Sequence, residues 1–147
     1  MAKKILFLDG DLLNLRYCWP CAEDKVHAGI LSEENAARLK AMALCQIAVN
    51  RTLVQFCFPV ACHKLQSFAS SHDFAPWALG TVMDFWRHYH NGKGDCAVRP
   101  AIIQKAQEQA VLVACDKKIL AAFNTYGLEL GVNDEVLLHR RVIVEKK

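Results

Sequence analysis

Residues 111–132, "VLVACDKKILAAFNTYGLELGV", contain the pattern from which the fold can be predicted. The first five of them form an apolar run, which is typical of a strand covered on both faces. Asp116 follows as a residue that commonly begins a helix, and Gly127 as one that commonly ends it. "LELGV" at 128–132 then has the length and composition of another strand. The stretch therefore predicts a strand, a helix and a further strand in succession.

The segments on either side of this stretch continue the alternation. Residues 101–110, "AIIQKAQEQA", predict a helix, and residues 136–146, "VLLHRRVIVEK", predict a last edge strand. At the start of the chain the apolar run from Lys4 to Leu8 predicts a buried strand that ends at Asp9-Gly10. Alternating strands and helices favour the α/β class. We expect a three-layer sandwich with a mostly parallel central sheet.

A long helical middle segment, residues 32 to 91, is expected to pack on the faces of that sheet. Ser32 is suited to cap a helix, with Glu33 and Glu34 in the first turn, where negative charge meets the positive end of the helix dipole. Good helix formers continue to about Phe56. After this long helix, two shorter helices are predicted at residues 60–68 and 76–89. A break in the helical structure is predicted at residues 90–94.

Length and composition indicate one compact domain, residues 1–147, rather than a disordered chain. Hydrophobic residues make up 53% of the sequence and charged residues 22%. The formal net charge of +3 permits contact with RNA without requiring it. Seven cysteines cannot all pair within one chain, which favours a reducing compartment. Polar residues interrupt the apolar stretch 41–62, which favours a buried helix over a membrane span. We therefore expect a cytoplasmic protein with no membrane segment.

Two aspartates directly follow predicted strands, Asp9 after the first and Asp116 after "VLVAC". If those strands are parallel neighbours, both carboxylates lie at the edge of the sheet where α/β proteins bind ligands. Adjacent carboxylates suit a hard divalent cation such as Mg²⁺, which prefers oxygen ligands. A metal held there could activate water for hydrolysis of a phosphodiester. Each aspartate also has a structural alternative, a helix cap for Asp116 and a strand-ending turn for Asp9.

The same two regions resemble a known family. "ILFLDGDLLN" at residues 5–14 is similar to the opening strand of PIN and NYN nuclease domains, and "AVLVACDKKILAAFNTYGLEL" at 110–130 is similar to their C-terminal strand, acid and helix. The resemblance implies a Mg²⁺-dependent ribonuclease. The catalytic residues that it implies are Asp9, Asp116, Asp11 and Glu34, of which the first two would bind the metal. Leu12 departs from the family, in which this position tends to be Asn.

Cys18 and Cys21 form a C-x-x-C motif, "CWPC". This spacing can form a disulfide or supply half of a zinc site. Cys115, at the end of a predicted strand, is the cysteine best placed to face a site in a parallel sheet. A small parallel α/β fold with reactive cysteines is similar to sulfur-transfer proteins of the DsrE type. A cytoplasmic thiol or sulfur-transfer protein is therefore the second candidate function, and cysteines that act as small buried hydrophobes are the structural alternative.

Two further interpretations concern partners. "FWRHYH" at 85–90 interleaves aromatic and cationic residues, which suits stacking on single-stranded RNA or, alternatively, inward packing of the aromatic rings. The third candidate function is a non-catalytic binding or oligomerisation module. Such a module would be expected to form a homodimer through its apolar helices.

Overall fold

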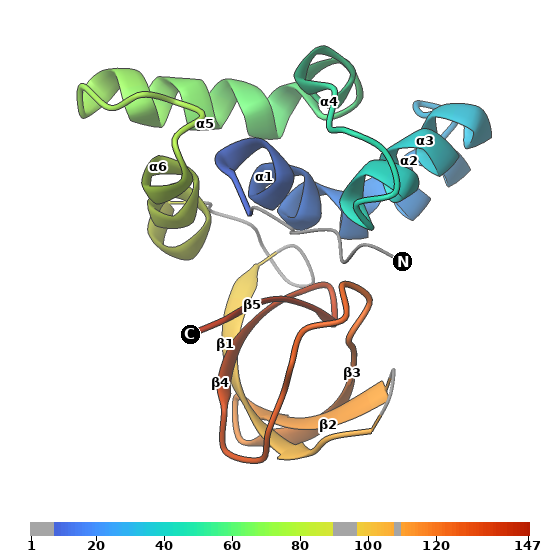
Figure 1. Cartoon of the computed structure of the whole chain (residues 1–147), viewed down its shortest axis with the longest axis vertical. Coiled ribbons are helices and arrows are strands. Elements are labelled where there is room, and N and C mark those ends of the chain that lie inside the picture. The colour runs from blue at the N-terminus through green and yellow to red at the C-terminus, as the bar shows by residue number, and fades with distance from the viewer. Residues whose placement is uncertain (1–7, 90–96, 108–109) are drawn as a thin grey trace, which may run out of the picture. The chain divides into compact units, whose positions relative to one another are not determined.

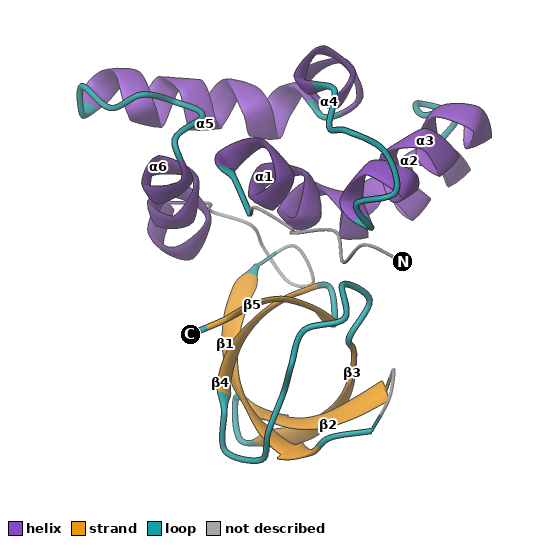
Figure 2. Ribbon diagram, viewed as in Figure 1, coloured by secondary structure: helices purple, strands orange, loops and turns teal. Residues whose placement is uncertain are grey.

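The chain forms two compact units in its computed structural model, the helical unit Met1–Tyr89 and the barrel unit His90–Lys147. Residues 8–89, 97–107 and 110–147 are described. All helices among them belong to the helical unit and all strands to the barrel unit (Figure 1; Figure 2). The sequence predicts one domain of residues 1–147, whereas the contacts divide between these two units.

The helical unit is built of short helices. In chain order they are α1 (Gly10–Cys18), the 3₁₀ turn η1 (Trp19–Cys21), α2 (Ala22–His27), α3 (Glu33–Ala43), α4 (Arg51–Cys57), α5 (Pro59–Ser71), α6 (Leu79–Asp84) and the π-helical turn η2 (Phe85–Tyr89). Within the described part of the chain, no helix combines the length and the apolar character needed to cross a membrane.

The central helix of this unit is α1. It contacts α3 and α6, and eight of its nine residues are buried. It begins at Asp9, whose Oδ1 accepts a 2.8 Å hydrogen bond from the backbone N–H of Leu12. Gly10 is required next, because a Cβ there would collide with the carbonyl oxygen of Trp77. Asp9-Gly10 therefore starts a helix; the strand predicted from Lys4 lies outside the described residues apart from Leu8.

The long helix predicted after Ser32 is two helices. Ser32 caps α3 as expected, since its Oγ accepts a 3.1 Å hydrogen bond from the backbone N–H three residues later. That helix ends at Ala43, and Cys45 has a left-handed φ of 61°. Asn50 then caps α4 in the same way. The prediction of a continuous helix to Phe56 is wrong, because α3 ends at Ala43 and a second helix, capped by Asn50, begins at Arg51. The shorter predicted helices are confirmed as α5 and as α6 with η2, and the break at 90–94 lies outside the described residues.

The barrel unit contains β1 (Val98–Lys105), β2 (Ala110–Cys115), β3 (Lys118–Phe123), β4 (Glu135–His139) and β5 (Val142–Lys146). These strands close in the order β1-β2-β3-β5-β4, and β4 pairs back onto β1 (Figure 1). Each pair is antiparallel except β3 with β5. The predicted three-layer sandwich with a mostly parallel central sheet is therefore wrong. Alternate residues of all the strands, from Ala101 to Ile143, fill the barrel interior.

Two tight hairpins, neither of which was predicted from the sequence, connect β2 to β3 and β4 to β5. Asp116 and Lys117 have φ values of 51° and 65° between β2 and β3. Arg140 and Arg141 have φ values of 50° and 66° between β4 and β5. Positive φ at both central residues is the geometry of a type I′ turn, which usually contains glycine. Neither pair does, so the ordinary hairpin signal is missing from the sequence.

These hairpins correct the predictions for the second half of the chain. The strand "VLVAC" is confirmed within β2. The helix predicted from Asp116 is instead a turn followed by β3, and the helix predicted at 101–110 is strand β1 as far as Lys105. Residues 128–132 form no strand, and 136–146 form two strands rather than one. Cross-strand pairing has overridden the helix propensity of the alanines and lysines in these segments.

Candidate thiol centre

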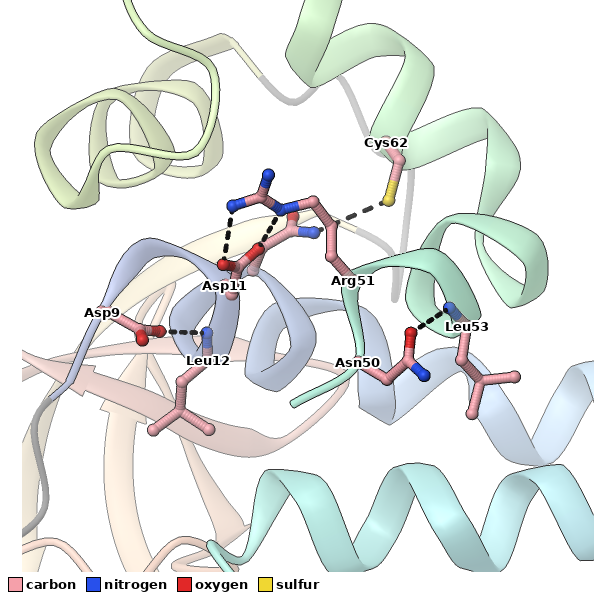
Figure 3. Close-up of polar contacts among 8 residues, drawn as sticks. Asp9, Asp11, Leu12, Asn50, Arg51, Leu53 and Cys62 are labelled. Atoms are coloured by element: carbon pink, nitrogen blue, oxygen red, sulfur yellow. Dashed lines mark hydrogen bonds and ion pairs between the residues drawn. The ribbon is translucent and has the colours of Figure 1, made fainter. Parts of the chain in front are cut away.

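Asp9 and Asp11, two of the predicted catalytic residues, make structural contacts at the start of α1 (Figure 3). Asp9 is the helix cap. Asp11 accepts hydrogen bonds of 2.7 Å and 2.9 Å from Nε and Nη2 of Arg51, and the same guanidinium lies 4.8 Å from the centroid of the Trp77 ring. Hydrogen bonding to Asp11 raises the pKa of Arg51. This pair ties α4 to α1. Both aspartates also line a cavity of about 430 Å³ beside Cys45.

The other two predicted residues lie elsewhere. Asp116 is exposed in the turn between β2 and β3, with its Oδ2 3.4 Å from Nη1 of Arg99, and Glu34 is exposed in the first turn of α3. Asp116 belongs to the barrel unit and Asp9 to the helical unit, so the parallel-sheet argument that brought them together no longer applies. Among the described residues, no group of three or more His, Cys, Asp or Glu side chains could hold a metal ion. Mg²⁺, RNA and ribonuclease activity stay predictions from the sequence.

Three cysteines gather around the end of α1. Cys18 is the last residue of α1, Cys21 is the last residue of η1, and Cys62 lies in the first turn of α5. None of these three cysteines forms a disulfide. Cys18 and Cys62 are each 2% exposed, and the Cys18 thiol is hydrogen-bonded to Cys62. Cys21 is only half-buried.

A second donor to Cys62 comes from Asn14, which lies one turn before Cys18 on the same face of α1. Nδ2 of Asn14 lies 3.6 Å from Sγ of Cys62, and Oδ1 of Asn14 accepts a 2.9 Å hydrogen bond from Nε1 of Trp86. An indole N–H can only donate, so the amide oxygen must face Trp86 and the amino group must face the sulfur. The Cys62 sulfur is therefore the acceptor; Figure 3 shows this contact as the dashed line that ends at Cys62.

Aromatic packing holds Trp86 in place. Its ring stacks on Tyr17 with centroids 5.0 Å apart and an interplanar angle of 4°. Phe85 meets it edge-on, at 5.4 Å and 81°. Phe85 and Trp86 are both buried, so the inward-packing alternative for "FWRHYH" is confirmed for these two rings. His90 lies outside the described residues.

These contacts make the two buried thiols chemically unequal. The hydrogen bond from Cys18 lowers the pKa of Cys62, with a smaller contribution from Asn14, while burial opposes both. Burial raises the pKa of Cys18 well above its ordinary value, and the hydrogen bond to Cys62 raises it further. Cys62 is therefore the sulfur that carries negative charge more readily, and Cys18 is the one that keeps its proton.

Cys115, the other thiol singled out in the sequence, lies in a different setting. It faces the interior of the barrel unit, and burial raises its pKa. Its Sγ lies 3.8 Å from Oδ2 of Asp116, and that carboxylate raises the pKa further. Cys115 behaves as a small core side chain.

The third candidate function, a binding or oligomerisation module, requires an exposed apolar face. Exposed apolar side chains are present in both units, among them Phe56 and Val60 on helices, Ile30 in the connection between α2 and α3, and Ile119 and Phe123 on β3. A homodimer stays a prediction from the sequence.

Sequence analysis singled out Cys18 and Cys21 but not Cys62, Asn14 or Trp86 as parts of one site. The Asn14 contacts span 48 residues to Cys62 and 72 residues to Trp86, so no motif spacing could reveal them. One signal was present. Asn14 stands between leucines in a helix that is buried nearly throughout, where a polar side chain needs a hydrogen-bonding partner.

Comparison of the chain with models of protein families, with curated proteins and with solved structures gives no match. The arrangement of side chains around Cys62 is therefore the basis for a functional proposal.

Proposed function

We propose that this protein is a thiol-based redox protein whose helical unit interconverts a Cys18/Cys62 dithiol and disulfide. The observation that carries the proposal is the buried Cys62 sulfur, which accepts hydrogen bonds from the Cys18 thiol and from the Asn14 amide. Among the candidate functions expected from the sequence, these contacts favour the thiol protein. They also favour Cys62 as the partner of Cys18.

Other buried cysteines provide the comparison that supports this choice. Burial raises the pKa of Cys57 on α4 and of Cys115 on β2, as expected of thiols that serve as core side chains. Cys62 is as buried as they are, yet its pKa is lowered because two groups donate to its sulfur. Donors to a thiol sulfur stabilise the thiolate, which is the nucleophile in thiol–disulfide exchange.

The net reaction passes two electrons from the cysteine pair to a disulfide R–S–S–R. A sulfur–sulfur bond forms between Cys18 and Cys62, and the sulfur–sulfur bond of R–S–S–R breaks. One R–S⁻ takes the proton of Cys18, and the other takes the proton that Cys62 releases when it ionises. The products are the Cys18–Cys62 disulfide and two molecules of R–SH.

The test uses the full-length reduced protein equilibrated with mixtures of reduced and oxidised glutathione. Free thiols are blocked in acid, and disulfide-linked peptides are identified by mass spectrometry. We expect one intramolecular disulfide between Cys18 and Cys62, with an occupancy that follows the squared concentration of reduced glutathione over that of the disulfide. A pair that stays reduced across the whole range would overturn the proposal.

Serine variants are needed to assign the bond. Trypsin leaves Cys18 and Cys21 on one peptide, because no Lys or Arg lies between them, and it leaves Cys57 and Cys62 on another for the same reason. A link between these two peptides does not by itself show which cysteines are joined. Cys18→Ser and Cys62→Ser should each abolish the disulfide. Cys57→Ser is the matched control, since it removes a buried thiol of the same unit and should leave the disulfide intact. A disulfide that survives Cys62→Ser but is lost in Cys57→Ser would contradict the assignment.

A further inference from the structure

We infer that Cys21 is the exchange thiol of this centre, through which disulfides of the size of glutathione disulfide or larger oxidise and reduce the buried pair. The inference rests on the proposed function. It assigns a role to the "CWPC" motif, which the Cys18/Cys62 reaction does not itself explain.

Access is the first reason. Cys18 and Cys62 are each 2% exposed, so a bulky disulfide cannot align with either sulfur for the in-line displacement that exchange requires. Cys21 is half-buried and so reaches the surface of the same cluster. Of the three thiols, Cys21 is the one that such a partner can contact.

The backbone between the two cysteines is the second reason. Trp19–Cys21 form a 3₁₀ turn for which Cys18 is the preceding cap residue, and residues three apart eclipse one another in 3₁₀ geometry. Pro20 lies in the first positions of that turn and restricts its backbone. Cys18 and Cys21 are thus presented on one side of the chain, and the charge of Cys21 raises the pKa of Cys18, as expected of neighbouring sulfurs.

Cys18 therefore has a neighbouring thiol on each side, Cys21 toward solvent and Cys62 in the interior. This order defines a relay of three displacements. In the first, Cys21 bonds to one sulfur of R–S–S–R, and R–SH leaves with the Cys21 proton. In the second, Cys18 bonds to Cys21 Sγ, its proton passes along the hydrogen bond to the Cys62 thiolate, and R–S⁻ leaves. In the third, Cys62 bonds to Cys18 Sγ, and Cys21 leaves with the proton of Cys62.

The sum of these steps is the oxidation of the Cys18/Cys62 dithiol by R–S–S–R. One R–S–S–R is reduced to R–SH and R–S⁻, Cys18 and Cys62 are oxidised, and Cys21 is returned as a thiol. Reduction by two molecules of R–SH follows the same route backwards. Cys21 is therefore needed for the rate with a bulky disulfide but not for the final disulfide.

The experiment compares the full-length protein with Cys21→Ser, and with Cys57→Ser as the control. Each reduced protein is oxidised by glutathione disulfide and, separately, by hydrogen peroxide. Peroxide is small, and it converts the Cys62 thiolate to a sulfenic acid that condenses with Cys18 and releases water. We expect Cys21→Ser to slow disulfide formation by glutathione disulfide about tenfold or more and to leave peroxide oxidation unchanged. Cys57→Ser should match the unmodified protein with both oxidants.

A trapping measurement keeps the inference testable if Cys21→Ser is poorly folded. In the variant Cys18→Ser the relay stops after its first step, so glutathione should remain attached to Cys21 and be found there by mass spectrometry. Glutathione attached to Cys62 instead, or wild-type exchange rates in Cys21→Ser, would overturn the inference while leaving the proposed function intact. Failure of the unmodified protein to form the Cys18–Cys62 disulfide with either oxidant would overturn the proposed function itself.

Discussion

Nε1 of Trp86 donates a 2.9 Å hydrogen bond to Oδ1 of Asn14, and this contact determines which end of the Asn14 amide meets Cys62. The amide cannot turn over without placing its amino group against the indole N–H, where two donors would face each other. The chemistry proposed for Cys62 therefore depends on a tryptophan in η2 as well as on the cysteines.

Replacing Asn14 by Ala should raise the pKa of Cys62. The substitution removes one donor to the sulfur, and a donor to the thiolate stabilises the charged form, so its loss moves ionisation to higher pH. It also leaves the Trp86 N–H without its acceptor, which should cost about 1–3 kcal/mol of stability. The ultraviolet absorbance of the thiolate, measured against pH with Cys62→Ser as the blank, tests this. Identical titrations of the unmodified protein and the Asn14→Ala variant would show that the amide does not tune the sulfur.

Replacing Trp86 by Phe should have a smaller effect in the same direction. Phenylalanine keeps an aromatic ring against Tyr17 but has no N–H, so the Asn14 amide loses the contact that orients it. The amide can then present either end to Cys62. We expect the pKa of Cys62 in this variant to lie between its value in the unmodified protein and its value in Asn14→Ala. The same absorbance titration measures it. A rise larger than that of Asn14→Ala would mean that Trp86 acts by packing rather than through the amide.

The helical unit could be predicted from its sequence better than the barrel unit, and the residues show why. Ser32 caps α3 by a local contact, and local contacts leave a local pattern. In β3 the inward residues Leu120 and Ala122 alternate with Ile119 and Phe123, which are 60% and 52% exposed. Apolar residues on both faces remove the alternation that identifies a strand. Only the Cys18 and Cys21 part of the thiol centre could be predicted from the sequence, because Cys62 and Asn14 come into contact through tertiary packing.

Gly10→Ala should destabilise the helical unit strongly. A Cβ at this position meets the backbone carbonyl of Trp77, which cannot move aside as a flexible side chain could. We expect a loss of about 1–3 kcal/mol or more, as for other overpacked sites. Gly80→Ala is the matched control, because no atom lies within 4 Å of its added Cβ and alanine favours the helix α6, so stability should rise by about 0.5–1 kcal/mol. Urea unfolding followed by circular dichroism compares the two, and equal effects would contradict the close approach.

Substitutions at Asp9 separate its cap from the catalytic role that the sequence resemblance implies. Asp9→Asn keeps an oxygen that can accept from the Leu12 N–H, so stability should change by less than about 0.5 kcal/mol. Asp9→Ala removes the cap and should cost about 1 kcal/mol. Cleavage of RNA in the presence of Mg²⁺, measured on the same variants, tests the ribonuclease prediction. That prediction requires cleavage by the unmodified protein and its loss in Asp9→Asn, and cleavage that survives Asp9→Asn would refute the role of this carboxylate.

Lys117→Gly should stabilise the barrel unit. Lys117 has a φ of 65° in the turn between β2 and β3, a conformation that costs an L-residue roughly 1–2 kcal/mol and glycine almost nothing. Glycine also gains entropy in the unfolded chain, which reduces the expected net gain to about 0.5–1 kcal/mol. Lys118→Gly is the matched control, because Lys118 is also exposed but begins β3 opposite Cys115, where glycine should cost about 0.5–1 kcal/mol. Unfolding midpoints that move in the same direction for both variants would contradict the left-handed backbone conformation of Lys117.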